Sequence, residues 1–116
     1  MGANQVSGHV GELRAANFLV ERGFAIIERN YRCRWGEADI VVWDGARVGF
    51  VEVKARSNTS FGSPAEAIGR DKLRRMQRVA EAWSRERKQV MPIWLGVVTI
   101  LGESAPELIT EIEAID

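Results

Sequence analysis

The sequence lacks most of the residues that build disulfides, zinc sites and membrane spans. Its 116 residues include one cysteine, Cys33, and one histidine, His9. A single thiol forms no intramolecular disulfide, and two such ligands fall short of the four that a structural zinc ion takes. No apolar run approaches membrane-spanning length, and the first residues do not resemble a signal peptide. We therefore expect a soluble, cytoplasmic protein without membrane contact.

Net charge is also lacking, because 16 basic residues balance 16 acidic ones. The net charge therefore gives no indication of a nucleic-acid partner. The distribution is nevertheless uneven: Arg70–Lys88 contains eight basic residues against three acids, and Leu101–Asp116 contains five acids and no base. The length fits one domain over residues 1–116.

Hydrophobic periodicity and turn residues predict a helix, three strands, helices and two strands, in that order. Ser63-Pro64-Ala65-Glu66 has the pattern of a capping box, and Asp71 is the expected cap of the longer helix that follows. The expected ranges are a helix over Val10–Arg22, a strand over Phe24–Arg29, a polar loop from Asn30 to Gly36, strands at Ala38–Val42 and Phe50–Lys54, helices from Ser63 and from Asp71 to Gln89, and strands over Ile93–Leu101 and Leu108–Ile115.

Apolar stripes on the two main helices indicate how they pack. The first helix should bury the stripe Val10, Leu13, Ala16 or Asn17, and Val20, and the longer helix should bury Leu73, Met76, Ala80 and Trp83. The last strand alternates polar and apolar residues, as an exposed edge strand does. Together these elements predict an α/β fold with a central mixed sheet flanked by helices.

Charged residues interrupt two strands that are otherwise apolar. Glu52 and Lys54 flank Val53 in one strand, and Asp39 lies thirteen residues before Glu52 in the preceding strand. A charge in such a strand costs several kcal/mol unless it is paired or bound to a cation. We interpret the acids as ligands kept for a metal ion.

The turn between these strands sets the distance between the acids. A two-residue loop at Gly45-Ala46 fits a type II′ turn and places Asp39 directly opposite Glu52, with Cβ atoms about 5 Å apart. A type I′ loop at Asp44-Gly45 instead places the two acids on a diagonal, roughly 7–8 Å apart. In either register, the alternation of side chains predicts that Glu37 shares the face of Asp39.

A purely structural interpretation competes with the metal. Glu52 and Lys54 could pair at the end of an edge strand, with Asp39 turned to solvent. Two observations disfavour it: the alternate faces are apolar as well, which is typical of a strand covered on both sides, and one lysine cannot neutralise three acids.

Several motifs between Gly8 and Ala82 resemble the YraN family. These are small bacterial proteins of the PD-(D/E)xK restriction-endonuclease-like superfamily, considered similar to archaeal Holliday-junction resolvases. The motifs that carry the resemblance are Gly11-Glu12 with Ala15 and Ala16, Asn30, Gly36-Glu37-Ala38-Asp39, Phe50 to Arg56, Phe61-Gly62, Pro64, Glu66-Ala67 and Lys72.

The resemblance implies a restriction-endonuclease-like fold of order α-β-β-β-α-β-β and an active site. Asp39 and Glu52 look like the metal-binding acids, together with the carbonyl of Val53. Lys54 looks like the active-site lysine, and Glu12 like the additional acid of the first helix. Glu37 is expected behind the direct ligands, and oxygen ligands favour Mg²⁺ or Mn²⁺. The chain departs from the family at Gly96, where Asp is common.

The resemblance implies a metal-dependent endonuclease acting on DNA, with branched or junction DNA as the substrate that the resolvase analogy suggests, and a two-fold homodimer. RNA remains an alternative substrate, and a non-catalytic nucleic-acid-binding or partner-binding protein on a nuclease fold is the alternative function. Most arginines of the long helix should only be solvated. The candidates for nucleic-acid contact are Lys72 at a phosphate, Arg32, Arg34 and Arg56 at the backbone, and Trp35 against an unstacked base.

Overall fold

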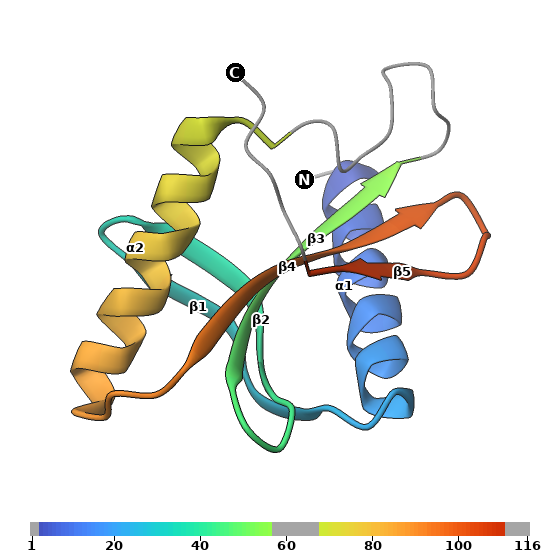
Figure 1. The fold of residues 1–116 in the computed structure, drawn as a ribbon. Coiled ribbons are helices and arrows are strands. Elements are labelled where there is room, and N and C mark those ends of the chain that lie inside the picture. Colours follow the sequence, from blue (N-terminus) through green and yellow to red (C-terminus); the bar gives the residue numbers. More distant parts are fainter. Residues whose placement is uncertain (1–2, 57–67, 111–116) are drawn as a thin grey trace.

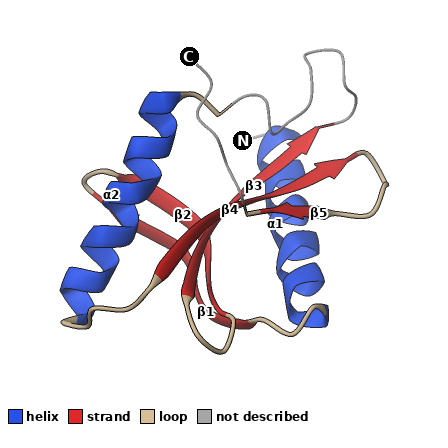
Figure 2. Ribbon diagram, viewed as in Figure 1, coloured by secondary structure: helices blue, strands red, loops and turns tan. Residues whose placement is uncertain are grey.

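Two helices cover opposite faces of one five-stranded sheet (Figures 1 and 2). The structure, a computed structural model, describes residues 3–56 and 68–110. Its elements are α1 (Ala3–Glu21), β1 (Ala25–Cys33), β2 (Gly36–Trp43), β3 (Val48–Arg56), α2 (Arg70–Arg87), β4 (Ile93–Leu101) and β5 (Glu107–Ile109).

The sheet has the strand order β1-β2-β3-β4-β5. Its β3–β4 pair is parallel and the other three pairs are antiparallel. The parallel pair needs a crossover connection, and α2 lies in that connection. This arrangement confirms the predicted α/β class, the mixed five-stranded sheet and the order of its elements.

The core has one main cluster on each face of the sheet. On the α1 side, Ala15 and Leu19 pack with Ile40, Val42 and Val51. On the α2 side, Val79 and Trp83 pack with Val41, Phe50 and Tyr31. Strands β2 and β3 therefore contribute apolar side chains to both layers, which is the pattern of strands covered on both faces.

The predicted stripe of the first helix is wrong except at Ala16, which is buried in the core. Val10, Leu13 and Val20 are 48%, 41% and 55% exposed, whereas Ala15 and Leu19 are fully buried. Small residues face the sheet because the helix approaches it closely: a Cβ atom added at Gly11 would lie 3.2 Å from the Cβ of Ala55. Helix α1 also begins earlier than predicted, at Ala3.

The predicted loop from Asn30 to Gly36 is mostly strand. Tyr31 pairs with Ala38 and Cys33 with Gly36, so only Arg34 and Trp35 remain in the turn between β1 and β2. The polar and charged residues that suggested a loop are accommodated because this part of β1 lies at the edge of the sheet.

The predictions for the remaining elements are mostly confirmed. Helix α2 buries Met76, Val79, Ala80 and Trp83. Its N-cap is Gly69, whereas the predicted cap, Asp71, lies in the first turn. The helix ends at Arg87, and Lys88 is its C-cap. Strand β5 is an edge strand as predicted, but it begins at Glu107, and the later part of the predicted strand lies outside the described residues. The predicted capping box at residues 63–66 also lies outside them.

Neither α1 nor α2 is both long and apolar enough to cross a membrane.

Trp94 fills the space over two glycines of neighbouring strands. The indole is 8% exposed, lies 5.7 Å from the Phe24 ring and donates a hydrogen bond from Nε1 to Asp44 Oδ2 at 3.2 Å. Gly49 pairs with Trp94 across β3 and β4, and a Cβ atom at Gly49 would overlap the indole. A Cβ atom at Gly96 would lie 2.7 Å from the same ring. The indole therefore occupies the space that the family's Asp would need at Gly96.

We expect Gly49→Ala to destabilise the protein by about 1–3 kcal/mol, the usual cost of overpacking a core. The added methyl group meets the fixed Trp94 ring and cannot turn away from it. Urea unfolding followed by far-UV circular dichroism measures the change. The double variant Gly49→Ala/Trp94→Leu should show a smaller loss than the sum of its single changes; additive losses would contradict the packing described.

Candidate functional site

The site begins where β2 and β3 separate. Their last pair toward the site is Ile40 with Val51. The connecting turn has Gly45 at φ 101°, and the Asp44 N–H donates to the Arg47 carbonyl at 3.1 Å. This register is the one predicted for a Gly45-Ala46 loop. If this register continued by one residue beyond Ile40 and Val51, Asp39 would lie directly opposite Glu52.

Side-chain alternation reverses at Asp39. Ile40 and Val42 pack on the α1 side, but Ala38 packs with Val41 on the α2 side, so residues two apart no longer share a face. The reversal coincides with Asn30 on β1, whose φ of 56° is left-handed. Asn tolerates this conformation better than most residues. The strand irregularity therefore frees Asp39 from the regular ladder.

Asp39 is tied to β3 through its side chain. Its Oδ2 atom accepts a hydrogen bond from the Val53 N–H at 2.7 Å. This bond spans the gap between the separating strands and brings the carboxylate to the main chain of Val53, between Glu52 and Lys54. Two predicted metal-site positions, Asp39 and Val53, are thus in direct contact.

Asp39 is the least compensated acid of the site. Burial is the main reason that its pKa rises from 3.8 to about 6, and the negative charges of Glu12, Glu52 and Glu37 raise it further, while the Val53 N–H lowers it. Repulsion between Asp39 and these three acids requires that they lie near one another, as the sequence predicts for Glu12, Glu37 and Glu52. Among the described residues, no basic side chain forms a salt bridge with Asp39.

Glu52 is contacted by two lysines from different elements. Its Oε1 atom lies 2.9 Å from Lys72 Nζ on α2 and 3.9 Å from Lys54 Nζ on β3. Its Oε2 atom is buried and has no hydrogen-bond partner in the part of the chain that the structure describes. A cavity of about 10 Å³ adjoins Glu52 and Phe50, roughly the room that one water needs. One carboxylate oxygen is therefore paired and the other is left without a ligand.

The edge-strand interpretation of these charges is right in part. Glu52 and Lys54 lie beyond the last pair of β2 with β3, so β3 pairs there with β4 alone, and their charged groups are 3.9 Å apart. Asp39, however, is partly buried and bonded to Val53 instead of turned to solvent. The three acids also face more than one basic residue, because Arg32 contacts Glu37 at 3.0 Å and Lys72 contacts Glu52 at 2.9 Å; Arg29 contacts the fourth acid, Glu12, at 3.8 Å.

The predicted nucleic-acid contacts lie around the acids but differ in their surroundings. Lys72 is 40% exposed and points to Glu52, and Arg56 is half-buried at the end of β3. Arg32 is exposed but paired with Glu37. The Trp35 ring is half-buried, with the guanidinium of Arg34 over it at 4.5 Å, so its role in base stacking stays a prediction.

The donor set suits a hard divalent cation. No cluster of three or more His, Cys, Asp or Glu side chains around one metal position occurs in residues 3–56 and 68–110. Mg²⁺ does not require one, because it is usually held by one or two carboxylates and keeps waters or substrate phosphates as its other ligands. Asp39 and Glu52 offer two carboxylates, and the orphaned Oε2 of Glu52 is free to accept a cation.

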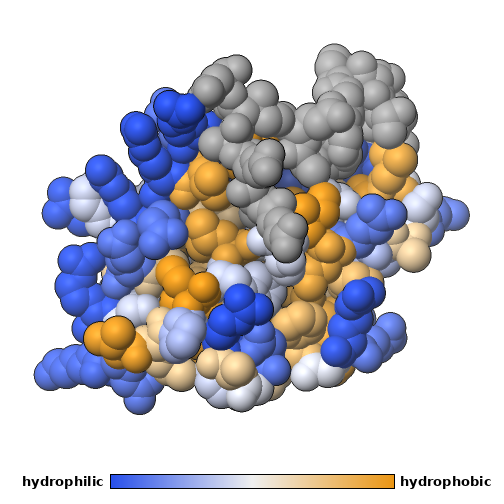
Figure 3. Space-filling view, viewed as in Figure 1, coloured by the Kyte–Doolittle hydropathy of each residue, from blue (hydrophilic) through white to orange (hydrophobic). Residues whose placement is uncertain are grey.

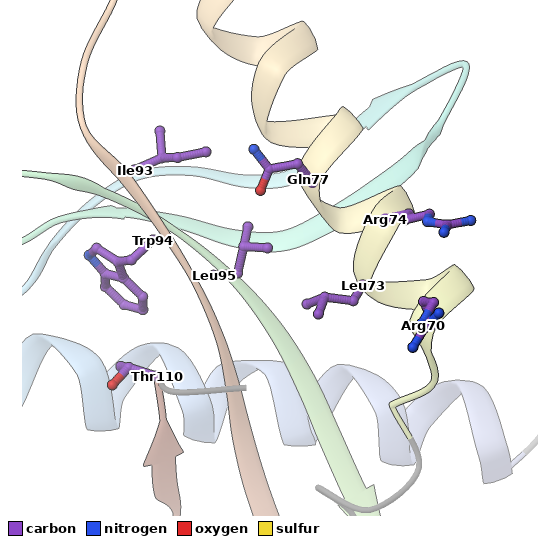
Figure 4. Close-up of a pocket in the computed structure, with 8 residues that line it drawn as sticks. All are labelled: Arg70, Leu73, Arg74, Gln77, Ile93, Trp94, Leu95 and Thr110. Carbon is purple, nitrogen blue, oxygen red and sulfur yellow. The ribbon is translucent and has the colours of Figure 1, made fainter. Parts of the chain in front are cut away.

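Larger hollows of the surface lie elsewhere. One of about 440 Å³ lies between α2 and β4 (Figure 4). Leu73, Ile93 and Leu95 form much of its wall, and Arg70 and Arg74 are its charged residues. No acid lines it among the described residues, and it shares no lining residue with the acidic site.

Sequence reasoning missed three residues of this region. Arg29 contacts Glu12, Asn30 marks the strand reversal, and Arg78 of α2 stacks on Trp35 at 4.6 Å. Asn30 did carry a signal, because it belongs to the family motif. Arg29 and Arg78 carried none, since their partners come from elements distant in the sequence.

The chain is similar to proteins without an assigned activity. The profile of the uncharacterised protein family UPF0102 matches residues 11–100. A UPF0102 protein of Arthrobacter sp. (strain FB24) is 42% identical over 106 residues, which cover 90% of each chain. A UPF0102 protein of Beutenbergia cavernae is 41% identical over 102 residues, 87% of this chain and 86% of the relative. One of Streptomyces griseus is 48% identical over 83 residues, 72% of this chain and 70% of the relative.

We expect Asp39→Asn to stabilise the metal-free protein at neutral pH. The folded-state pKa of about 6 exceeds the ordinary 3.8, so folding is penalised once Asp39 ionises. The pKa difference of about 2 lowers the free energy of unfolding by up to about 3 kcal/mol above pH 6. This loss disappears as the pH falls toward 4, because Asp39 is then protonated in the folded protein. Urea unfolding in EDTA between pH 4 and pH 8 measures it.

Asp71→Asn is the matched control, because Asp71 is 87% exposed. Its effect should stay below about 1 kcal/mol. If Asp39→Asn were less stable than the wild type at pH 7, the energetic penalty assigned to the ionised carboxylate would be contradicted.

Proposed function

This chain belongs to the uncharacterised protein family UPF0102, the YraN family that its motifs resemble, and we propose that it is a metal-dependent nuclease that hydrolyses phosphodiester bonds in DNA. One observation carries the proposal: two acids meet where β2 and β3 separate, and both lack full compensation. Asp39 has a raised pKa and Glu52 keeps a buried, unpartnered oxygen.

Asp39, Glu52 and the main-chain carbonyl of Val53 would hold the cation, Mg²⁺ or Mn²⁺. When bound, such an ion lowers the pKa of a nucleophilic water and stabilises charge on the phosphate and leaving oxygen. The protein's own contribution is positioning. The bond from the Val53 N–H fixes Asp39 Oδ2, and the pairing of β3 with β4 holds Glu52 and Lys54 in place.

Lys54 and Glu12 would act around the reacting phosphate. Lys54 Nζ is 3.9 Å from Glu52 and 27% exposed, so it can orient the attacking water or stabilise the phosphate charge. Glu12 is brought to the same region by α1 and is 22% exposed. Its contact with Arg29 is long, at 3.8 Å, which leaves its carboxylate available to hold a water.

The substrate would bind across the surface and not in a deep pocket, because the cavity beside Glu52 is too small for a nucleotide. Lys72 and Arg56 are the nearest candidates for backbone phosphates. Branched DNA and a two-fold dimer remain predictions that rest on the similarity of the family to junction resolvases.

One observation favours the non-catalytic alternative. Three of the four acids have a basic partner, Glu12 with Arg29, Glu37 with Arg32 and Glu52 with Lys72. A protein that neutralises its acids internally needs no metal to fold and could bind nucleic acid or a protein without cutting it.

We expect Mg²⁺- or Mn²⁺-dependent cutting of labelled DNA, lost on addition of EDTA. Glu52→Gln and Lys54→Met should each reduce the rate at least 100-fold, because each removes a group that holds or stabilises the reacting atoms. Four-way junction, flap, single-stranded, duplex and matched RNA substrates are compared on gels.

Glu103→Gln, an exposed acid in the turn after β4, serves as control and should cut normally. Cutting that survives in Glu52→Gln purified identically would indicate a contaminating nuclease. A wild type that binds neither metal nor any of the substrates would overturn the proposed function; binding of DNA without metal or cutting would support the alternative.

We further expect Lys72→Met to bind Mn²⁺ several-fold more tightly than the wild type. Lys72 Nζ lies 2.9 Å from Glu52 Oε1 and therefore competes with a cation for that carboxylate. Isothermal titration calorimetry measures the affinity, with Lys88→Met as a control on the same helix. Weaker binding by Lys72→Met would show that the lysine supports the site and does not compete with the ion.

A further inference from the structure

Two arginines from different elements share one indole at the end of the β1–β2 hairpin. The guanidinium carbon of Arg34 lies 4.5 Å from the centre of the Trp35 ring, and that of Arg78 lies 4.6 Å from it. Arg34 and Trp35 form the hairpin turn, and Arg78 lies on α2. Figure 1 shows this turn beside α2. We call the three residues the Trp35 clamp.

The ring of the clamp is a fixed platform. Trp35 is half-buried and packs against the core cluster that contains Tyr31, Val79 and Trp83. The turn that carries it is held by the pairing of Cys33 with Gly36. A guanidinium over an aromatic face loses none of its N–H donors, because these lie at the edge of its plane. Both arginines are therefore held over the ring with their N–H donors directed away from it.

The charges of the clamp are uncompensated within residues 3–56 and 68–110. Neither Arg34 nor Arg78 forms an ion pair there. Five other arginines are paired: Arg29 with Glu12, Arg32 with Glu37, Arg47 with Asp44, Arg74 with Asp71 and Arg87 with Glu28. Two like charges held against one ring repel each other, and an anion bound to both relieves that repulsion. Guanidinium groups match the geometry of phosphate in particular.

The clamp lies along α2 from the acidic site. Lys72 contacts Glu52 near the start of the helix, and Arg78 follows it by six residues, a rise of about 9 Å. Figure 3 shows hydrophilic side chains gathered over α2, where a strand could follow the helix.

We propose that the Trp35 clamp binds a backbone phosphate of the nucleic-acid strand, away from the bond that is cut. The inference rests on the proposed nuclease function and adds a second contact point to it. It also changes two predictions from the sequence. Arg78 becomes a binding residue instead of a solvated one, and Trp35 supports two guanidinium groups instead of stacking on a base.

Binding to labelled DNA tests the clamp without cutting. All variants carry Glu52→Gln and are measured by fluorescence anisotropy in EDTA at several salt concentrations. Arg34→Gln and Arg78→Gln should each weaken binding about 5- to 10-fold and reduce the slope of log affinity against log salt by about 1. Arg85→Gln, an exposed position on the same helix, should change affinity less than 2-fold.

The outcomes separate the clamp from the proposed function. Normal affinity and slope in Arg34→Gln and Arg78→Gln, with a wild type that cuts DNA, would overturn the clamp and leave the nuclease intact. An equal loss in Arg85→Gln would show only general attraction and would also overturn it. A wild type that neither binds nor cuts would remove both proposals. Circular dichroism and thermal melting confirm that each variant is folded.

Two further probes identify the ligand of the clamp. An oligonucleotide with abasic sites should bind as tightly as the intact one, because the phosphates are retained; weaker binding would favour base stacking on Trp35. Pyrophosphate alone should bind with millimolar or weaker affinity, since it lacks the rest of the backbone. Tight binding of pyrophosphate that depends on Arg78 would overturn the nucleic-acid assignment in favour of a small phosphorylated ligand.

Discussion

The site depends on one hydrogen bond, from the Val53 N–H to Asp39 Oδ2 at 2.7 Å. Strands β2 and β3 pair as far as Ile40 and Val51, and beyond this point the carboxylate takes a main-chain donor of the neighbouring strand. The strand reversal at Asn30 and Asp39 makes this possible, because it releases Asp39 from the alternation that would otherwise bind it to one face. The Asp39 side chain thus bridges the gap between the separating strands, and Glu12, Glu37 and Glu52 lie near enough to raise its pKa.

The electrostatic balance of this region explains how the chain tolerates several acids in its sheet. Arg29, Arg32 and Lys72 each contact one acid, and Asp39 is the acid that receives only a main-chain donor and carries a raised pKa. Stability and the proposed metal binding are therefore opposed at Asp39, and functional sites often keep a group in an unfavourable state for its chemistry. The long Lys54–Glu52 and Arg29–Glu12 contacts indicate that these pairs are not optimised for stability.

Much of the architecture could be predicted because local signals agreed with the fold. The turn at Gly45 and the apolar stripe through Met76, Ala80 and Trp83 follow from turn chemistry and helical periodicity. The stripe on α1 was misassigned because hydrophobicity suggested Val10 and Leu13, whereas close approach to β3 selects Gly11 and Ala15. The strand from Asn30 to Cys33 was missed because its polar residues resemble a loop, and only cross-strand pairing with β2 reveals it.

The sequence by itself determined the class of fold, limited the β2–β3 hairpin to two registers and pointed to the acids, because each depends on residues that are close along the chain. The structure selected the register with Gly45 and Ala46 in the loop. Only the tertiary structure decided which charges are compensated. Arg29 reaches Glu12, Lys72 reaches Glu52 and Arg78 reaches Trp35 across different elements, and such contacts depend on the packing of helices against the sheet. Burial, which raises the pKa of Asp39, likewise arises only when both layers close over the strands.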